Sequence, residues 1–213
     1  MRELNSIQEK ILDRTLFVIG LKGSYDVSVR DITNAAGVNV NAIHYYFGNK
    51  EALFDRMEEF FIENYLSIHS VLEDRDINDE QKLMHWANEI MEYTLQYPGI
   101  QIILHNNMSG KGRNGKMAKF LIEQSNEFHH RINELFSRLF NVQSDQLMLM
   151  RIIFDSALLY PASFGTRPNC DFTKIRDKSF RLSYIKYIIQ LLKQGKKHNE
   201  IIQFYSEQGA YTP

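Results

Sequence analysis

A chain of 213 residues is long enough to fold as one or two domains with a sizeable hydrophobic core. With 44% hydrophobic and 24% charged residues it is not an intrinsically disordered chain, and its formal net charge of −1 excludes a globally basic surface. The single cysteine, Cys170, excludes an intrachain disulfide, and the charged N-terminal residues and the lack of a long apolar run predict a cytoplasmic protein without a signal peptide or membrane span.

Apolar residues at helical spacing predict the first elements. They indicate a helix over 6–22 that ends near Gly23, and a longer helix from 49 to about 72. Two short helices, at about 28–36 and 39–46, lie between them. The polar stretch Glu73–Glu80 that follows is the expected hinge between domains.

The rest of the chain also shows helical spacing. Pro98-Gly99 should stop a helix over 81–97, and Pro161 should bend or end a helix that Ser144 caps. No strand-like alternation of useful length appears, so the fold class is all-α, with about nine helices divided three plus six. The remaining expected pieces are an apolar segment at Ile100–Leu104, a long helix over 117–139, a last long helix capped by Asp171, and a short segment at Ile201–Tyr205.

Residues 28–50 carry the most specific local pattern. Ser28 can cap a helix, with Asp31 three residues later in its first turn. Gly37 stands where the chain must turn sharply, a position that often requires a positive φ. Val38–Phe47 then form a second helix. Two short helices joined by a tight turn make a helix-turn-helix, whose second helix enters the DNA major groove.

This segment resembles the DNA-binding domain of the tetracycline-repressor (TetR) family of bacterial regulators. The resemblance covers the first quarter of the chain. The family usually has Tyr at the position of His44 and His at the position of Tyr46. The matching residues are Val29-Arg30-Asp31-Ile32, Ala35-Ala36-Gly37-Val38, and the run from Ile43 to Leu53, which holds Phe47, Lys50 and Leu53 in a Phe-x-x-Lys-x-x-Leu pattern.

The candidate DNA contacts divide by chemistry. Arg30 can bond a guanine, Asn41 can bond base edges, and Val40 can pack on a thymine methyl. Residues 38–47 contain no Lys or Arg, and residues 1–55 contain six Lys and Arg against seven Asp and Glu, so the patch is not basic in sum. Asn39 can cap the second helix or face a phosphate. The resemblance implies base contacts from Arg30, Val40 and Asn41, and phosphate contacts from Ser28, His44, Tyr45 and Lys50.

The resemblance also implies a homodimer formed by the last two long helices. We therefore assign residues 1–50 to the DNA-binding domain and 51–213 to an effector-binding and dimerisation domain. Its many aromatic residues suit a mostly apolar pocket for a small hydrophobic effector. The candidate effector-binding residues are Trp86, Tyr93, His105, Asn107, Phe120, Gln124 and Phe154, and the candidate dimer residues are Met148, Ile152, Phe180, Tyr184 and Ile188.

Other chemistries find little support in the sequence. Gly110–Met117 fits G-x-x-x-x-G-K, but Met117 stands where a phosphate-binding loop needs Ser or Thr, and no strand precedes it. His129 and His130 are adjacent and point about 100° apart on a helix, so we expect no metal site. No catalytic set of residues stands out, and we expect no cofactor and no enzymatic activity.

These patterns predict a ligand-responsive transcriptional regulator. We interpret it as a repressor that binds a near-palindromic double-stranded DNA operator as a dimer. A transcriptional activator and a constitutive DNA-binding protein without an effector are alternatives. A helical enzyme with a vestigial DNA head is a further alternative, which a catalytic set of residues in the second domain would favour.

Overall fold

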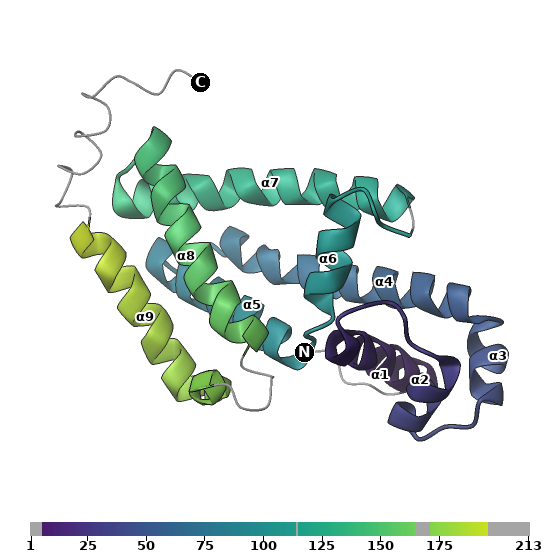
Figure 1. Ribbon diagram of the computed structural model, residues 1–213. Helices are drawn as coiled ribbons and strands as arrows, with labels where there is room; N and C mark the ends of the chain where they lie inside the picture. The colour runs from purple at the N-terminus through teal and green to yellow at the C-terminus, as the bar shows by residue number, and fades with distance from the viewer. Residues whose placement is uncertain (1–5, 114, 165–170, 196–213) are drawn as a thin grey trace, which may run out of the picture. The chain divides into compact units, whose positions relative to one another are not determined.

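The computed structural model describes residues 6–113, 115–164 and 171–195, and every regular element in these ranges is helical (Figure 1). The all-α class is confirmed. The segment expected at Ile201–Tyr205 lies outside the described residues. The elements are α1 (Ile7–Lys22), α2 (Val29–Ala36), α3 (Asn41–Phe47), α4 (Lys50–Ser67), the 3-10 helix η1 (Ile68–Glu73), α5 (Asp79–Gln96), α6 (Ile100–Met108), α7 (Gly115–Phe140), α8 (Ser144–Phe164), the 3-10 helix η2 (Asp171–Arg176) and α9 (Lys178–Gly195).

The described residues group into two compact units. The first holds residues 6–70 and 90–128, and the second holds residues 71–89 and 129–195. Helices α5 and α7 contribute to both units, because the division falls at Ile90 in α5 and at His129 in α7. The expected division of function at residue 50 stays a prediction.

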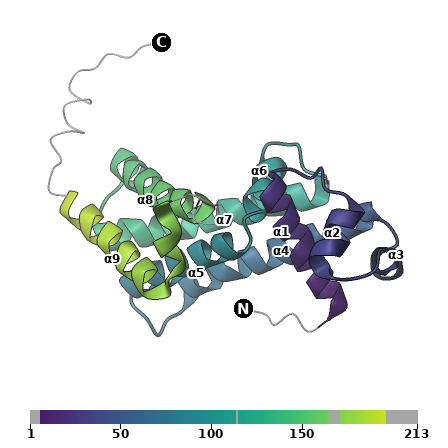
Figure 2. The same cartoon turned by 60° about the horizontal axis from the view of Figure 1, so that its bottom comes forward.

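The first unit is built around one hydrophobic core. Ile32 of α2, Ile43 of α3 and Phe54 of α4 are buried in it together with Leu16 of α1 and Ile103 of α6. Both views place α3 at the edge of the group formed by α1, α2 and α3 (Figures 1 and 2). A short helix at the edge of the unit can therefore present most of its surface outward while one side chain holds it to the core.

Two glycines allow the backbones of α1 and α6 to meet. A Cβ on Gly20 would lie 2.6 Å from the backbone nitrogen of Gly99, and a Cβ on Gly99 would lie 2.4 Å from the carbonyl oxygen of Leu16. Any larger residue at either position would push the two helices apart. Gly20 interrupts the interior of a helix, where glycine usually costs about 1 kcal/mol relative to alanine, and this close approach explains its presence.

The second unit has a core that contains packed aromatic rings and a buried cation. The ring of Phe154 lies 6.3 Å from that of Trp86 and 5.2 Å from that of Phe136, measured between centroids. Arg181 of α9 is buried, and its guanidinium donates hydrogen bonds to the Asn88 side chain of α5 at 2.9 Å and to the Ile175 carbonyl of η2 at 3.2 Å. One side chain thus joins three elements.

Helices α3 and α9 begin later than the sequence predicts. Helix α3 begins at Asn41. Asn39 lies before the helix, and its side chain accepts a hydrogen bond from the Asn41 amide at 2.9 Å. Asp177, not Asp171, caps α9, and its carboxylate accepts from the Phe180 amide at 2.7 Å. Residues 171–176 instead form η2.

Pro161 was expected to bend or end α8, and it does not end it, because the helix continues through Pro161 to Phe164. Proline has no N–H and cannot donate to the carbonyl four residues earlier, which belongs to Ala157. That carbonyl accepts a hydrogen bond from the Tyr184 hydroxyl of α9 at 2.7 Å. Tyr184 therefore supplies the donor that Pro161 lacks and stabilises a helix that contains proline.

This compensation can be measured with a double-mutant cycle. Tyr184→Phe should lower the free energy of unfolding by about 1 kcal/mol, because it leaves a carbonyl without its donor. The same change in a Pro161→Ala background should cost less, since the alanine amide restores the helical bond. Urea unfolding of the four proteins gives the coupling energy, and a coupling energy of zero would contradict the account.

Candidate nucleic-acid interface

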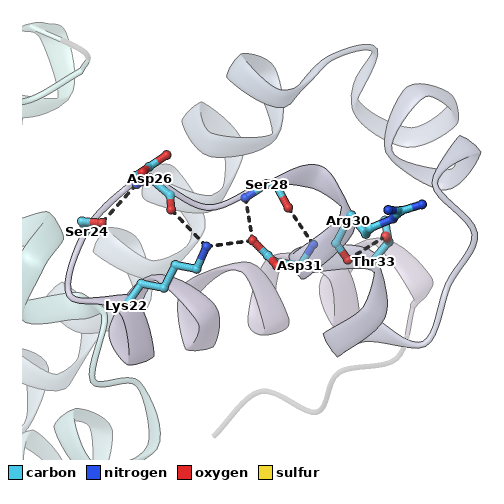
Figure 3. A network of polar contacts seen from close by, with 7 residues as sticks. All are labelled: Lys22, Ser24, Asp26, Ser28, Arg30, Asp31 and Thr33. Carbon is cyan, nitrogen blue, oxygen red and sulfur yellow. Dashed lines mark hydrogen bonds and ion pairs between the residues drawn. The ribbon is translucent and has the colours of Figure 1, made fainter.

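A polar network fixes the start of α2 (Figure 3). The Asp31 amide donates to the Ser28 hydroxyl at 3.1 Å, and the Ser28 amide donates to the Asp31 carboxylate at 2.9 Å, which completes a capping box. Lys22, at the end of α1, donates to the same carboxylate at 2.8 Å and to the Asp26 carbonyl at 3.3 Å. The Lys22 bond, followed by the Ser28 bonds, lowers the pKa of Asp31. The carboxylate therefore stays ionised and joins two helices.

The turn between α2 and α3 closes in the expected way. Gly37 has a φ of 61°, and its amide bonds back to the Asn34 and Thr33 carbonyls. Glycine adopts this left-handed backbone conformation without steric strain, whereas most other residues would be strained in it. The predicted helix-turn-helix is present, and its turn is closed by backbone bonds.

Only one side chain of α3 is fully buried. Ile43 is in the core, whereas Tyr45 is 82% exposed and Val40, which precedes the helix, is 44% exposed. This surface can reach a DNA groove without rearrangement of the core. Of the eight residues predicted to contact DNA, seven are exposed and Lys50 is half-buried: Ser28, Arg30, Asn39, Val40, Asn41, His44, Tyr45 and Lys50.

Hydrogen bonds restrict what some of these residues can offer to DNA. The His44 Nδ1 atom lies 2.9 Å from the Gly48 carbonyl. A carbonyl can only accept, so Nδ1 carries a proton and a neutral ring presents only an acceptor at Nε2. Asn39 uses its side-chain oxygen on the Asn41 amide, which leaves its NH₂ group for another acceptor. The Lys50 ammonium lies 5.2 Å from the centre of the Phe54 ring.

A second polar cluster supports the first turns of α4. The Tyr25 hydroxyl donates to the Glu58 carboxylate, and Arg113, in the segment before α7, pairs with Glu51. The Arg113 guanidinium also lies 5.0 Å from the centre of the Phe54 ring. The sequence analysis missed this cluster, because nothing in the sequence indicates that Arg113 returns to a helix 62 positions earlier.

The pKa values of the acidic groups in this cluster are shifted by burial and by hydrogen bonds. Burial raises the pKa of Glu58, and hydrogen bonding from Tyr25 and the charge of Arg113 oppose that rise. Burial, and then the charge of Glu58, raise the pKa of Tyr25, so its hydroxyl keeps its proton and donates. Glu51 is at the surface, and the Arg113 bond lowers its pKa.

A family comparison matches this part of the chain. The model for bacterial regulatory proteins of the tetR family matches residues 11–57, which run from α1 into α4. Residues 11–57 are therefore a TetR-type DNA-binding region. The matched range includes the capping box, the Gly37 turn and all of α3.

A curated relative matches part of the chain. The chain is 37% identical over 60 residues to the Bacillus subtilis (strain 168) protein named "Probable HTH-type transcriptional regulator YttP". That match spans 28% of this chain and 29% of the curated relative, so it concerns less than a third of either protein.

Solved structures extend the likeness of the fold. A TetR family transcriptional regulator, PfmR from Thermus thermophilus, has a TM-score of 0.60 at 17% identity and covers 84% of this chain and 97% of its own. The fatty acid degradation regulator FadR from Bacillus halodurans has a TM-score of 0.56 at 18% identity, over 91% and 98% of the two chains. At these identities the likeness concerns the fold alone.

The seven candidate effector residues fall in different units. Trp86 and Phe154 are buried beside each other in the second unit. In the first unit, Tyr93 donates to the Phe61 carbonyl at 3.0 Å and Asn107 is buried. The three others also belong to the first unit, where His105 and Phe120 are exposed and Gln124 is half-buried.

Helices α8 and α9 carry the candidate dimer residues and many other exposed apolar side chains. Met148 is 56% exposed and Ile152 is 55% exposed, while Ile188 is buried within the unit. Phe180 is exposed and Tyr184 is half-buried. The sequence analysis missed further exposed apolar residues on these two helices, which are Leu149, Ile153, Tyr160, Tyr187 and Leu191.

Two pockets lie in the second unit. One, of about 260 Å³, is lined by α8, η2 and α9, and the other, of about 420 Å³, is lined by α7 and α8. Neither is lined by a candidate effector residue. In the described residues no group of three or more His, Cys, Asp or Glu is placed to hold a metal ion. No helix there combines the length and hydropathy that crossing a bilayer requires.

The buried Glu58 makes a pH-dependent contribution to stability. An acid whose pKa is raised by folding binds its proton more tightly in the folded chain, so the free energy of unfolding falls as pH rises from the unfolded value of about 4.3 through the folded pKa. Glu58→Gln keeps an acceptor for Tyr25 and removes the charge. In urea unfolding it should lose part of the wild-type decline that sets in as pH rises above about 4.3.

The exposed Glu63, one turn away on α4, provides the control for this experiment. Glu63→Gln should retain the wild-type pH dependence. If Glu58→Gln retained it as well, burial of the Glu58 carboxylate would not be the cause.

Proposed function

We propose that this chain is a ligand-responsive transcriptional repressor that binds a near-palindromic DNA operator as a homodimer and leaves it when a small hydrophobic effector binds. The observation that carries the proposal is the capped helix-turn-helix. In its second helix Ile43 is buried in the core, and the polar and aromatic side chains are accessible. One alternative is a transcriptional activator, because promoter geometry decides between activation and repression. The other is a constitutive DNA-binding protein, in which no effector is coupled to DNA binding.

DNA reading in this proposal depends on neutral groups and one arginine. Helix α3 has no Lys or Arg, so Asn41 and Val40 would contact base edges, while Arg30 would reach a guanine from α2. Figure 3 shows the Arg30 side chain extending away from the capping network. Its guanidinium is therefore not occupied by the bonds that hold α2 in place.

Arg30→Ala should separate base reading from phosphate binding. On the preferred operator it should cost about 1–3 kcal/mol of binding free energy, with a smaller loss on random DNA. Lys50→Ala is the contrasting variant: it should weaken binding to all sequences and lower the salt slope by about 1 per DNA-binding domain. Fluorescence anisotropy over a salt series measures both. Equal losses for Arg30→Ala on the two DNAs would assign Arg30 to phosphate.

A dimer would bring two such domains to one operator. The exposed apolar residues of α8 and α9 supply apolar surface that a second copy would cover. Two α3 helices related by a two-fold axis would read half-sites about one DNA turn, roughly 34–36 Å, or a multiple of it apart. The phosphate contacts of the two domains would add, which offsets the lack of net positive charge in each.

Tyr187→Lys should convert the full-length protein to monomers. Tyr187 is 59% exposed in the described chain, so the change should leave the fold intact and bury an unpaired charge only if the surface pairs with a second copy. Met108→Lys, at a similarly exposed position in the first unit, is the matched control and should stay dimeric. Light scattering that reported the same mass for both variants would place the interface elsewhere.

The effector part of the proposal rests on the aromatic residues, Trp86 among them. An aromatic wall with few charges suits a flat or greasy molecule better than a sugar or phosphate. Binding would be coupled to DNA reciprocally, so DNA must weaken effector binding by the same factor by which the effector weakens DNA binding. The candidate residues are those named in the sequence analysis.

Trp86 is the only tryptophan, so its fluorescence reports on its own surroundings. In a panel of hydrophobic compounds, some should quench this emission and also release the operator, by a factor of about 5–150 in affinity. Trp86→Phe should remove the signal without removing the release. Compounds that quench Trp86 but never change operator affinity would contradict the coupling and leave a constitutive DNA-binding protein.

A further inference from the structure

The segment from α1 to the start of α4 contains five Lys and Arg side chains, and three of them interact with other parts of the protein. Arg14 pairs with the buried carboxylate of Asp13. Lys22 bonds to the Asp31 carboxylate at 2.8 Å. Lys50 is half-buried, with its ammonium over an aromatic ring. Two cations of the segment remain, and both have a place beside the helix-turn-helix.

These two cations, Lys10 of α1 and Arg30 of α2, are exposed. The Lys10 ammonium has no hydrogen bond or ion pair to another described residue. It lies at the turn of the helix-turn-helix, since a Cβ on Gly37 would stand 3.9 Å from it. Asn39, a candidate phosphate contact, follows two residues later, so its Cα lies within about 8 Å of that of Gly37. The two exposed cations therefore stand at opposite ends of α2.

A cation at this turn supplies charge that the candidate DNA surface lacks. Salt-dependent affinity for DNA comes from Lys and Arg side chains that neutralise phosphates. Of the four phosphate contacts that the TetR resemblance implies, Lys50 alone is a Lys or Arg. A lysine is a compact charge with three donors on a flexible stem, so it can bind a backbone phosphate without a fixed orientation. Because Lys10 belongs to α1, outside the helix that enters the groove, its position favours phosphate over base edges.

We propose that Lys10 binds a phosphate of the DNA backbone beside the turn between α2 and α3, which makes α1 a DNA-contacting element. The inference deepens the DNA binding proposed above and rests on it. The contact positions the domain along the strand and carries no sequence information, in contrast to Arg30 at the other end of α2. It also explains how a segment without net positive charge can bind DNA. Cations such as Lys22 pair with acids inside the domain, whereas the two exposed cations flank α2.

The test compares the purified full-length protein with its Lys10→Gln variant on two DNAs, a pool of random-sequence duplexes and the operator recovered from that pool by selection. The variant should weaken binding to both DNAs by the same factor, because a phosphate contact is independent of sequence. It should lower the salt slope by about 0.9 per domain, or about 1.8 for a dimer. The affinity ratio of wild type to variant should therefore fall roughly tenfold between about 50 mM and 200 mM salt. Fluorescence anisotropy over a salt series measures this ratio.

Two further variants separate a local contact from a change in total charge. Lys10→Arg keeps the charge and should keep the wild-type slope. Lys119→Gln removes an exposed charge from α7 in the same unit and should also keep it. The inference alone is overturned if the wild type binds DNA and Lys10→Gln keeps its slope, or if Lys119→Gln lowers the slope equally. A wild-type protein that binds neither DNA would overturn the proposed function as well.

Discussion

The shared carboxylate of Asp31 is the interaction on which the DNA-binding surface depends. It accepts from the Ser28 amide and from Lys22, so one side chain both caps α2 and joins that helix to the end of α1. A capping interaction of this kind stabilises the start of a helix, and an exposed ion pair adds little. Its larger effect is geometric: the direction of α2 sets the turn at Gly37, and the turn sets where α3 presents its exposed side chains.

The support behind this surface comes from residues distant in sequence. Arg113 pairs with Glu51 beside the start of α4, and Gly20 lets α1 approach the backbone at Gly99. The first unit therefore includes α6 and parts of α5 and α7, well beyond residue 57 where the family match ends. A signal that moved α6 would act directly on the core that holds α3. In the second unit, Tyr184 and Arg181 hold α8, η2 and α9 together in a comparable way.

Local patterns predicted local structure well. Ser28, Asp31 and Gly37 were identified from spacing alone, because caps and left-handed turns depend on residues a few positions apart. Boundaries that involve distant partners were not predictable: where α8 passes Pro161, Tyr184 supplies a donor from another helix. The candidate DNA residues are accessible as a group, since surface position follows from the helix-turn-helix pattern. The candidate effector residues divide between two units, and His105 and Phe120 are exposed, because helical spacing does not show which core a side chain faces or whether it is buried at all.

The most direct test of the central claim, that this chain reads DNA through α3 as a dimer, is selection of double-stranded DNA from a random library by the purified full-length protein, followed by sequencing. The account predicts enrichment of two inverted half-sites whose centres lie about one helical turn, roughly 34–36 Å, or a multiple of it apart. Recovery of no preferred sequence, or of a single half-site without an inverted partner, would contradict it.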